Sequence, residues 1–226
     1  GVEMEPQRVP VMQKMITGRA RQARVPVIIA TQMLESMTVN PRPTRAEASD
    51  VANAIFDGND AVMLSGETAM GRYPVETVQI MDRIIREAEA SMPEFPRPQR
   101  HQFSSVPGTT AELICHASRE LPLKVIAVFT ETGATARLIS NYRPRQPIVA
   151  FSPEEDTRRQ ISLLWGVLPR KTKPLRNVEE MVGFAERLLL EERLVHKGDL
   201  VGIVAGTPLG VDGSTNFIRF HVVGGG

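Results

Sequence analysis

Apolar runs alternate with segments of helical periodicity through the first part of the chain. The spacing of the apolar positions predicts helices over 6–23, 45–56 and 74–91, with strands over 25–30 and 60–64. The first strand ends at Thr31 and the second at Ser65-Gly66-Glu67-Thr68. Buried parallel strands deliver hydroxyls and carboxylates in this way to the rim of a sheet or barrel.

A second α/β series follows a proline-containing stretch, 92–108, which we interpret as a linker. Its pattern predicts strands over 125–129, 147–151, 167–171, 199–204 and 217–222, and helices over 109–120, 135–142, 178–194 and from Pro153. The Gly-rich loop 206–213 suits a hairpin, so the last strand is expected to run antiparallel. We therefore predict an α/β protein with domains over 1–91 and 109–223.

Composition narrows the class of protein. The chain has 226 residues, a formal net charge of +1 and dispersed basic residues, which gives no electrostatic basis for binding nucleic acid or an anionic membrane. No apolar run reaches membrane-spanning length. The single cysteine, Cys115, lies in an apolar helical pattern and is interpreted as a small buried hydrophobe. We expect a cytoplasmic protein without nucleic-acid or membrane partners.

Thr31 is the first candidate for chemistry. A hydroxyl at the carboxyl end of a buried parallel strand lies where barrel and doubly wound enzymes place ligand-binding groups. It is equally consistent with a threonine that only caps the turn.

The segment Pro43-Thr44-Arg45-Ala46-Glu47 contains the second candidate. Thr44 followed three residues later by Glu47 predicts a capping box, which explains both residues without a function. Arg45 is harder to explain, because a cation in the first turn of a helix opposes the helix dipole. It is a candidate for contact with an anion or an acidic surface, and a solvated arginine is the alternative.

The turn Thr130–Thr135 is the third candidate. Thr130, Thr132 and Thr135, together with Gly133, lie between a buried strand and the start of a helix. Free backbone N–H groups and hydroxyls in this position form a phosphate-binding site, although an ordinary turn has a similar sequence. No histidine pair has metal-ligand spacing, and the dinucleotide fingerprint is absent, which argues against a nicotinamide-dependent oxidoreductase.

Residues 25–74, VPVIIATQMLESMTVNPRPTRAEASDVANAIFDGNDAVMLSGETAMGRYP, resemble the pyruvate kinase family without a gap. In the second part, TETGATARLISNYRP and GSTNFIRFHVV resemble the regulatory C-terminal domain of that family. The resemblance implies a partial TIM (β/α)₈ barrel, formed by its last βα units, followed by a separate α/β domain with a five-stranded mostly parallel sheet. It covers essentially the whole chain.

This resemblance also implies an activity, namely phosphoryl transfer from phosphoenolpyruvate to ADP in glycolysis, giving pyruvate and ATP. The family uses Mg²⁺ (or Mn²⁺) and K⁺, but its metal-binding acids and catalytic lysine lie upstream of the matched region. We therefore expect no metal ligand in this chain and no catalysis by the chain alone. A non-catalytic α/β module that binds a phosphorylated effector is the alternative.

Individual residues acquire roles from the same resemblance. Thr31 matches the active-site threonine, and Arg45 matches an arginine that reaches a neighbouring subunit near its active site in a homotetramer. Thr130, Thr132, Gly133 and Thr135 match the effector phosphate loop. Members that bind a sugar bisphosphate have basic residues in this loop, whereas this chain has Glu131 and Ala134. The resemblance therefore favours AMP, a sugar monophosphate or no effector over fructose bisphosphate.

Overall fold

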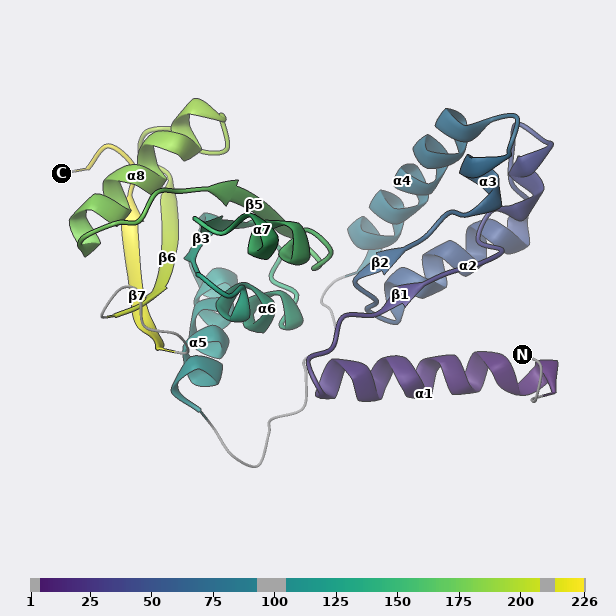
Figure 1. The fold of residues 1–226 in the computed structure, drawn as a ribbon, viewed down its shortest axis with the longest axis horizontal. Helices are drawn as coiled ribbons and strands as arrows, with labels where there is room; N and C mark the ends of the chain where they lie inside the picture. The colour runs from purple at the N-terminus through teal and green to yellow at the C-terminus, as the bar shows by residue number, and fades with distance from the viewer. Residues whose placement is uncertain (1–4, 93–104, 208–213, 226) are drawn as a thin grey trace. The chain divides into compact units, whose positions relative to one another are not determined.

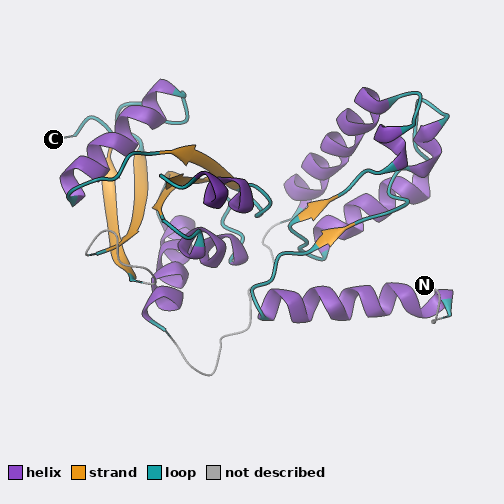
Figure 2. Ribbon diagram, in the orientation of Figure 1, coloured by secondary structure: helices purple, strands orange, loops and turns teal. Residues whose placement is uncertain are grey.

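The structure is a computed structural model that describes residues 5–92, 105–207 and 214–225. The chain divides into two compact units, 1–96 and 97–226, each an assembly of helices and strands (Figures 1 and 2). Most of the predicted linker and most of the predicted hairpin loop lie outside the described residues. Within the described part of the chain, no helix is long and apolar enough to cross a membrane.

The first unit contains two short parallel strands and the helices that pack around them. Its elements are η1 (Pro6–Arg8), α1 (Val9–Gln22), β1 (Ile28–Ile29), η2 (Glu35–Thr38), α2 (Arg45–Phe56), β2 (Ala61–Val62), α3 (Gly66–Ala69) and α4 (Pro74–Ser91). β1 and β2 pair in parallel, as predicted, but each is shorter than its apolar run. Among the described residues they form a two-stranded sheet, so neither strand has a second neighbour to extend its ladder.

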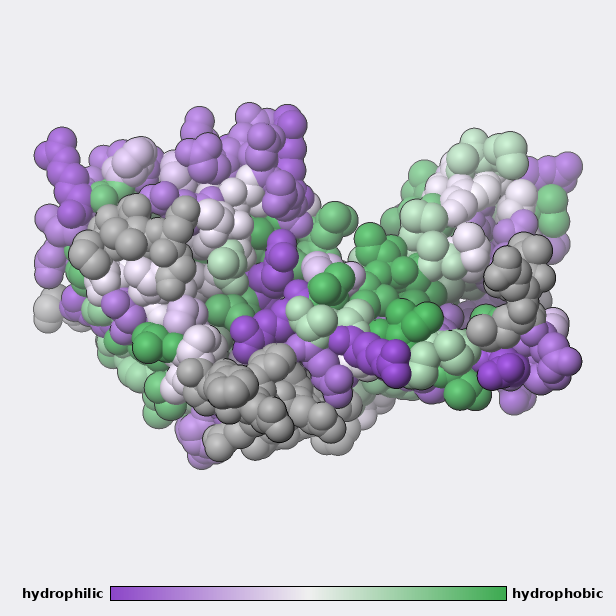
Figure 3. Space-filling view, turned by 60° about the horizontal axis from the view of Figure 1, so that its bottom comes forward, coloured by the Kyte–Doolittle hydropathy of each residue, from purple (hydrophilic) through white to green (hydrophobic). Residues whose placement is uncertain are grey.

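The core of the first unit lies between α2, α4 and the loop that follows β1. Buried residues of this loop, Met33, Leu34 and Met37, pack with Val51 of α2 and Met81 of α4. α2 begins with the predicted capping box. Other apolar side chains of the unit are exposed, and α1 buries only Thr17. Figure 3 shows hydrophobic residues on this unit's surface.

The second unit is a five-stranded sheet with helices on both faces. Its elements are α5 (Val106–Glu120), β3 (Leu123–Phe129), α6 (Ala134–Asn141), β4 (Ile148–Ser152), α7 (Glu155–Ile161), β5 (Val167–Lys171), α8 (Val178–Glu191), β6 (Leu200–Gly206) and β7 (Thr215–Val222). The strand order is β5-β4-β3-β6-β7, and only β7 pairs antiparallel within this order. The sheet is therefore five-stranded and mostly parallel, as predicted.

Alternation along the central strands produces two cores. Ile126, Val128 and Ala150 face α5, α6 and α7, whereas Ala127 and Val149 face α8. Strands buried on both faces have nearly continuous apolar sequences, which is why β3 and β4 were predictable. Cys115 belongs to the first of these cores and is fully buried, as its sequence context indicated.

Two predicted helix starts are wrong. α5 begins at Val106 rather than Thr109, because the Ser105 hydroxyl accepts a hydrogen bond from the Gly108 N–H at 3.2 Å. Pro107 fits the first turn of a helix, which has no use for its missing N–H, so the predicted linker extends too far. α7 begins at Glu155, and Ser152 is the last residue of β4 rather than a helix cap.

Candidate functional site

The turn between β3 and α6 is built around Gly133. Its φ of 81° is unfavourable for residues with a side chain, and an added Cβ would lie 2.5 Å from Ile161 Cγ2. The Gly133 N–H donates to Thr130 Oγ1 at 2.9 Å. Local hydrogen bonding therefore closes the turn and leads the chain directly into α6.

The threonines of this turn have different environments. The Thr135 and Thr215 hydroxyl oxygens lie 2.6 Å apart and are buried, which joins the start of α6 to the start of β7. Thr132 is exposed. Thr130 and Thr135 are thus engaged within the protein, whereas the Thr132 hydroxyl has no hydrogen-bond partner among the described residues.

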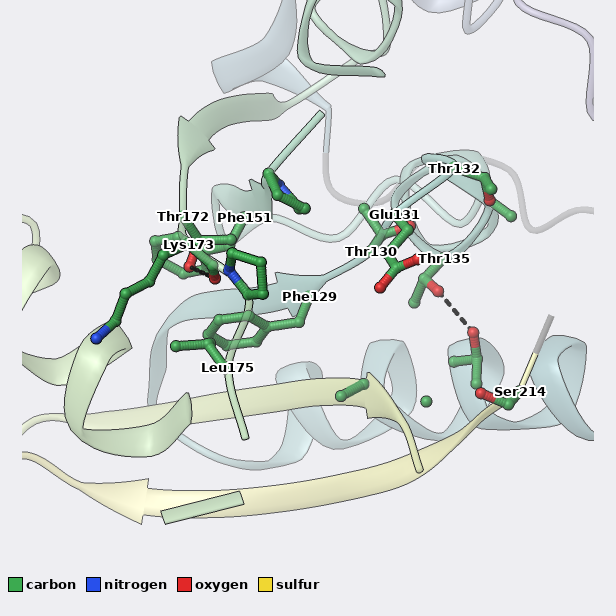
Figure 4. Close-up of a pocket in the computed structure, with 16 residues that line it drawn as sticks. Phe129, Thr130, Glu131, Thr132, Thr135, Phe151, Thr172, Lys173, Leu175 and Ser214 are labelled. Atoms are coloured by element: carbon green, nitrogen blue, oxygen red, sulfur yellow. Dashed lines mark hydrogen bonds between the residues drawn. The ribbon is translucent and has the colours of Figure 1, made fainter. Parts of the chain in front are cut away.

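The turn lines a cavity of about 200 Å³ at the carboxyl ends of the parallel strands. Figure 4 shows Phe129 between the threonine turn and the β5 end, where Lys173 and Leu175 lie. The lining residues are Phe129, Thr130, Glu131, Thr132, Ala134, Thr135, Phe151, Pro153, Thr172, Lys173, Pro174, Leu175, Ala205, Gly206, Ser214 and Thr215. The structure thus brings three of the four predicted effector residues to one cavity, while Gly133 is buried and does not line it.

The cavity residues that follow β5, on the side opposite the turn, were not predicted from the sequence. Thr172, Lys173 and Leu175 follow β5, about forty residues after the turn, and no local motif marks them. The only signal was a basic group at Arg170–Lys173 after an apolar run. Because parallel strands end at the same edge of the sheet, residues after β5 and β3 share a site.

The charges around the cavity favour a ligand of low negative charge. Glu131 at the turn is exposed, and its carboxylate would repel a nearby phosphate. Lys173 Nζ pairs with Glu180 Oε1 at 3.1 Å, and Figure 4 shows its side chain extending away from the turn. The hydrogen bond from the Arg176 N–H, together with the contact with Lys173, lowers the pKa of Glu180.

Thr31 lies in a strained turn two residues after the end of β1. Its φ is 73° and that of Gln32 is 57°, so two consecutive residues with side chains adopt the left-handed region. A positive φ is a conformational outlier for a β-branched residue. Thr31 is exposed, and its hydroxyl has no hydrogen-bond partner in the described part of the chain.

Two carboxylates hold the loop that follows this turn. Glu67 Oε1 accepts from the Leu34 N–H at 3.2 Å, and Glu47 Oε1 accepts from the Ser36 N–H at 2.7 Å. Burial opposes ionisation of both groups, but the hydrogen bonds they accept outweigh it and lower the pKa of each. The strand-end carboxylate noted in the sequence, Glu67, is therefore buried and serves the protein's own backbone.

Arg45 is the first residue of α2 and is exposed. Among the described residues it makes no ion pair that would offset its position in the first helical turn. The structure therefore leaves its side chain available to an external partner.

The described residues do not form a metal site. No group of three or more His, Cys, Asp or Glu side chains within them is arranged to hold an ion. The described residues therefore do not supply a ligand set for the divalent metal that the resemblance implies.

Comparison with known proteins gives the same family for both units. The family model described as "Pyruvate kinase, barrel domain" matches residues 1–78, and "Pyruvate kinase, alpha/beta domain" matches residues 108–221. The pyruvate kinases of Sporosarcina psychrophila and Clostridium acetobutylicum are each 44% identical to 99% of this chain. The chain covers 39% and 48% of these two relatives, respectively.

A solved structure supports this result. A pyruvate kinase from Cryptosporidium parvum matches with a TM-score of 0.88 and 35% identity, over 99% of this chain and 45% of the solved chain. The chain thus spans less than half the length of these relatives, and it matches the models of two domains of one family. The chain belongs to the pyruvate kinase family.

Proposed function

We propose that this chain is the carboxyl-side part of a pyruvate kinase, which transfers a phosphoryl group from phosphoenolpyruvate to ADP. The observation that carries the proposal is the family match over both units, 1–78 and 108–221. The position of Thr31 supports it, since a strained residue with an unpaired hydroxyl at a strand end is typical of an active site. The proposal places the reaction in glycolysis and in the cytoplasm.

In this proposal, Thr31 assists the last step of the reaction. Loss of the phosphoryl group leaves the enolate of pyruvate, which becomes pyruvate when its methylene carbon receives a proton. A positioned hydroxyl can deliver this proton directly or through water, and such assistance contributes about 10²–10⁴-fold to the rate. The hydroxyl is free for this role because it makes no bond within the described residues.

We propose that the 226-residue chain does not catalyse the reaction by itself. The family resemblance places the catalytic lysine and the acids that bind Mg²⁺ (or Mn²⁺), as well as the K⁺ ligands, outside the matched region. Arg45, exposed at the start of α2, would contact a neighbouring subunit of a homotetramer.

A chimera tests the proposed activity. This chain replaces the matching segment of the Clostridium acetobutylicum pyruvate kinase, and pyruvate formation is followed in a coupled assay. We expect the chimera to be active and the isolated chain to be inactive. Turnover by the isolated chain would contradict the second expectation, and a folded but inactive chimera would contradict the assigned activity.

Substitution of Thr31 tests its role in the same chimera. Thr31→Ala is expected to lower kcat by about 10²-fold or more, whereas Thr31→Ser, which retains the hydroxyl, keeps most of the activity. Equal activity of the alanine and serine variants would remove Thr31 from the mechanism.

We further propose that the cavity in the second unit binds a monophosphate, such as AMP or a sugar monophosphate, as an effector. The turn Thr130–Thr135 offers backbone N–H groups and the Thr132 hydroxyl, which suffice for one phosphate. The Glu131 carboxylate opposes a second phosphate nearby. A non-catalytic effector-binding module is the second candidate function, because every residue that lines this cavity belongs to the second unit.

Calorimetry on the purified chain tests the effector proposal. AMP or a sugar monophosphate is expected to bind, with weaker binding after Thr132→Ala, and fructose bisphosphate is expected to bind only after Glu131→Lys. Glu120→Lys makes the same charge change at the last residue of α5, away from the cavity, and serves as the control. Tight bisphosphate binding by the unmodified chain that is lost in Thr132→Ala would overturn the proposal.

A further inference from the structure

The unfavourable backbone conformation of Thr31 and Gln32 must be stabilised by contacts with the rest of the protein. Left-handed backbone at two consecutive residues with side chains, one of them β-branched, costs free energy and persists only where the surroundings impose it. Thr31 and Gln32 are both exposed, so their own side chains do not supply this restraint. The restraint must come from the residues on either side, namely the preceding β1, which pairs with β2, and the loop that follows, which two carboxylates hold.

Glu67 supplies the first restraint. It follows β2 in the sequence and is only 1% exposed. Its Oε1 accepts from the Leu34 N–H at 3.2 Å, and its Oε2 accepts from the Ser65 N–H at 2.8 Å. One carboxylate therefore ties the loop after β1 to the loop after β2.

Glu47 supplies the second restraint. Its Oε1 accepts from the Ser36 N–H at 2.7 Å, and its Oε2 accepts from the Ser36 hydroxyl at 2.6 Å. The capping box with Thr44 would form without either bond. The contacts with Ser36 thus go beyond a helix cap, because they fasten the same loop to α2.

Apolar packing completes the anchorage. Met33 and Met37, the residues on either side of the two anchored positions, are buried in the core of the first unit. The loop is therefore held at Leu34 by Glu67 and at Ser36 by Glu47, whereas Thr31 and Gln32 before it remain exposed.

We propose that Glu67 and Glu47 form a carboxylate clasp whose role is to position the Thr31 turn for the reaction. The importance of Thr31 rests on the proposed function, whereas the clasp itself rests on the geometry above. The two glutamates are positioning residues, since they act through the loop and not on the substrate.

The chemistry of the clasp makes it sensitive to loss of charge. A carboxylate has acceptors only, which suits Glu67 because both of its oxygens meet backbone N–H groups. Glutamine would turn an NH₂ group toward one of these donors. Glu47→Gln has a similar effect, because Glu47 Oε1 accepts from the Ser36 N–H and Oε2 accepts from the Thr44 N–H, so the new NH₂ group meets a backbone donor in either orientation.

Hydrogen exchange on the 226-residue chain tests the clasp without relying on activity. In Glu67→Gln, amides of 33–38 are expected to exchange at least ten times faster, with α2 and α4 unchanged. Glu35→Gln removes a charge from the same loop, where Glu35 is exposed and has no described hydrogen-bond partner, and is expected to have no effect. Unchanged exchange in Glu67→Gln, or the same increase in Glu35→Gln, overturns the proposal.

Glu47→Gln provides a second variant for the hydrogen-exchange test, in case Glu67→Gln unfolds the first unit. Faster exchange at 33–38 in Glu47→Gln, with α4 and the interior of α2 unchanged, supports the clasp. Exchange identical to that of the unmodified chain overturns it.

Kinetics of the chimera test the consequence for catalysis. Glu67→Gln is expected to lower kcat about tenfold with little change in KM for ADP, whereas Glu35→Gln retains both values. An unchanged kcat, or a loss confined to KM, overturns the positioning role. If the unmodified chimera is folded but inactive, the proposed function fails, and the exchange result still decides the clasp.

Discussion

Gly133 is the residue whose identity matters most for the shape of the turn Thr130–Thr135. We expect Gly133→Ala to destabilise the second unit by about 1–3 kcal/mol, because the alanine would have φ near 81° and its Cβ would meet Ile161. Gly183→Ala is the matched control, since Gly183 lies within α8 with no atom in reach of an added Cβ. The free energy of unfolding of this control variant is expected to rise by about 0.5–1 kcal/mol, because alanine is more favourable than glycine inside a helix. Urea unfolding of both variants checks the difference.

Cys115 is expected to be inert in the folded protein. Burial raises the pKa of its thiol to about 12, so very little reactive thiolate is present at pH 7. A thiol-specific reagent is expected to label it only when the second unit unfolds, and no other cysteine in the chain competes for the label. Rapid stoichiometric labelling of the native protein would contradict this expectation.

The contact between α8 and β7 makes stability depend on pH. Glu186 of α8 bonds to the largely buried His221 of β7, and this bond lowers the pKa of Glu186 against the opposing effect of burial. A carboxyl with a lower pKa in the folded state stabilises the fold above its unfolded pKa of about 4.3, and this contribution is lost as the pH falls through its folded pKa.

Glu186→Gln is therefore expected to cost about 1–2 kcal/mol at pH 7 and much less at pH 3. Glu179→Gln, at an exposed position of the same helix, is expected to change the free energy of unfolding by less than about 0.5 kcal/mol at either pH. Urea unfolding across this pH range measures both variants. A cost that is independent of pH would contradict a role for the Glu186 carboxylate in this contact.

Helices and strands were predictable wherever residues close together in the sequence determine them. The Thr44 and Glu47 capping box follows from residues three apart, and the buried strands β3 and β4 follow from continuous apolar runs. β1 and β2 came out shorter than their apolar runs, because strand length depends on pairing partners that a local pattern does not reveal. Local signals thus predict the type of an element better than its ends.

The sites were predictable only in part, because their members come from distant parts of the chain. Thr31 and the turn Thr130–Thr135 stand at strand ends and are recognisable there. Lys173 joins the cavity only through the parallel order of β3, β4 and β5. Likewise, Glu67 was visible as a strand-end carboxylate, but its bond to the Leu34 N–H spans 33 residues.

The two units differ in how well they are packed. The second has a core on each face of a five-stranded sheet, whereas the first has one small cluster. Most of the large apolar side chains exposed in the described part of the chain also belong to the first unit, among them Val11 at 70% and Ile16 at 56%. Burial of apolar surface is the main stabilising term in folding, so the first unit is expected to be the less stable.

We therefore predict that the isolated chain unfolds in two steps, with the first unit unfolding at lower urea concentration. Trp165, the only tryptophan, lies in the second unit with the Arg143 guanidinium 5.3 Å from its ring centroid. Its fluorescence thus reports the second unit alone, whereas far-ultraviolet circular dichroism reports helices of both units. We expect the dichroism to begin changing while the fluorescence is still native, because transitions coincide only in two-state unfolding.

Hydrogen exchange at intermediate urea should then show α2 and α4 unprotected while β3 and β4 remain protected. Coincident transitions by both probes would mean that the units unfold together, and the difference in core size would then not govern stability.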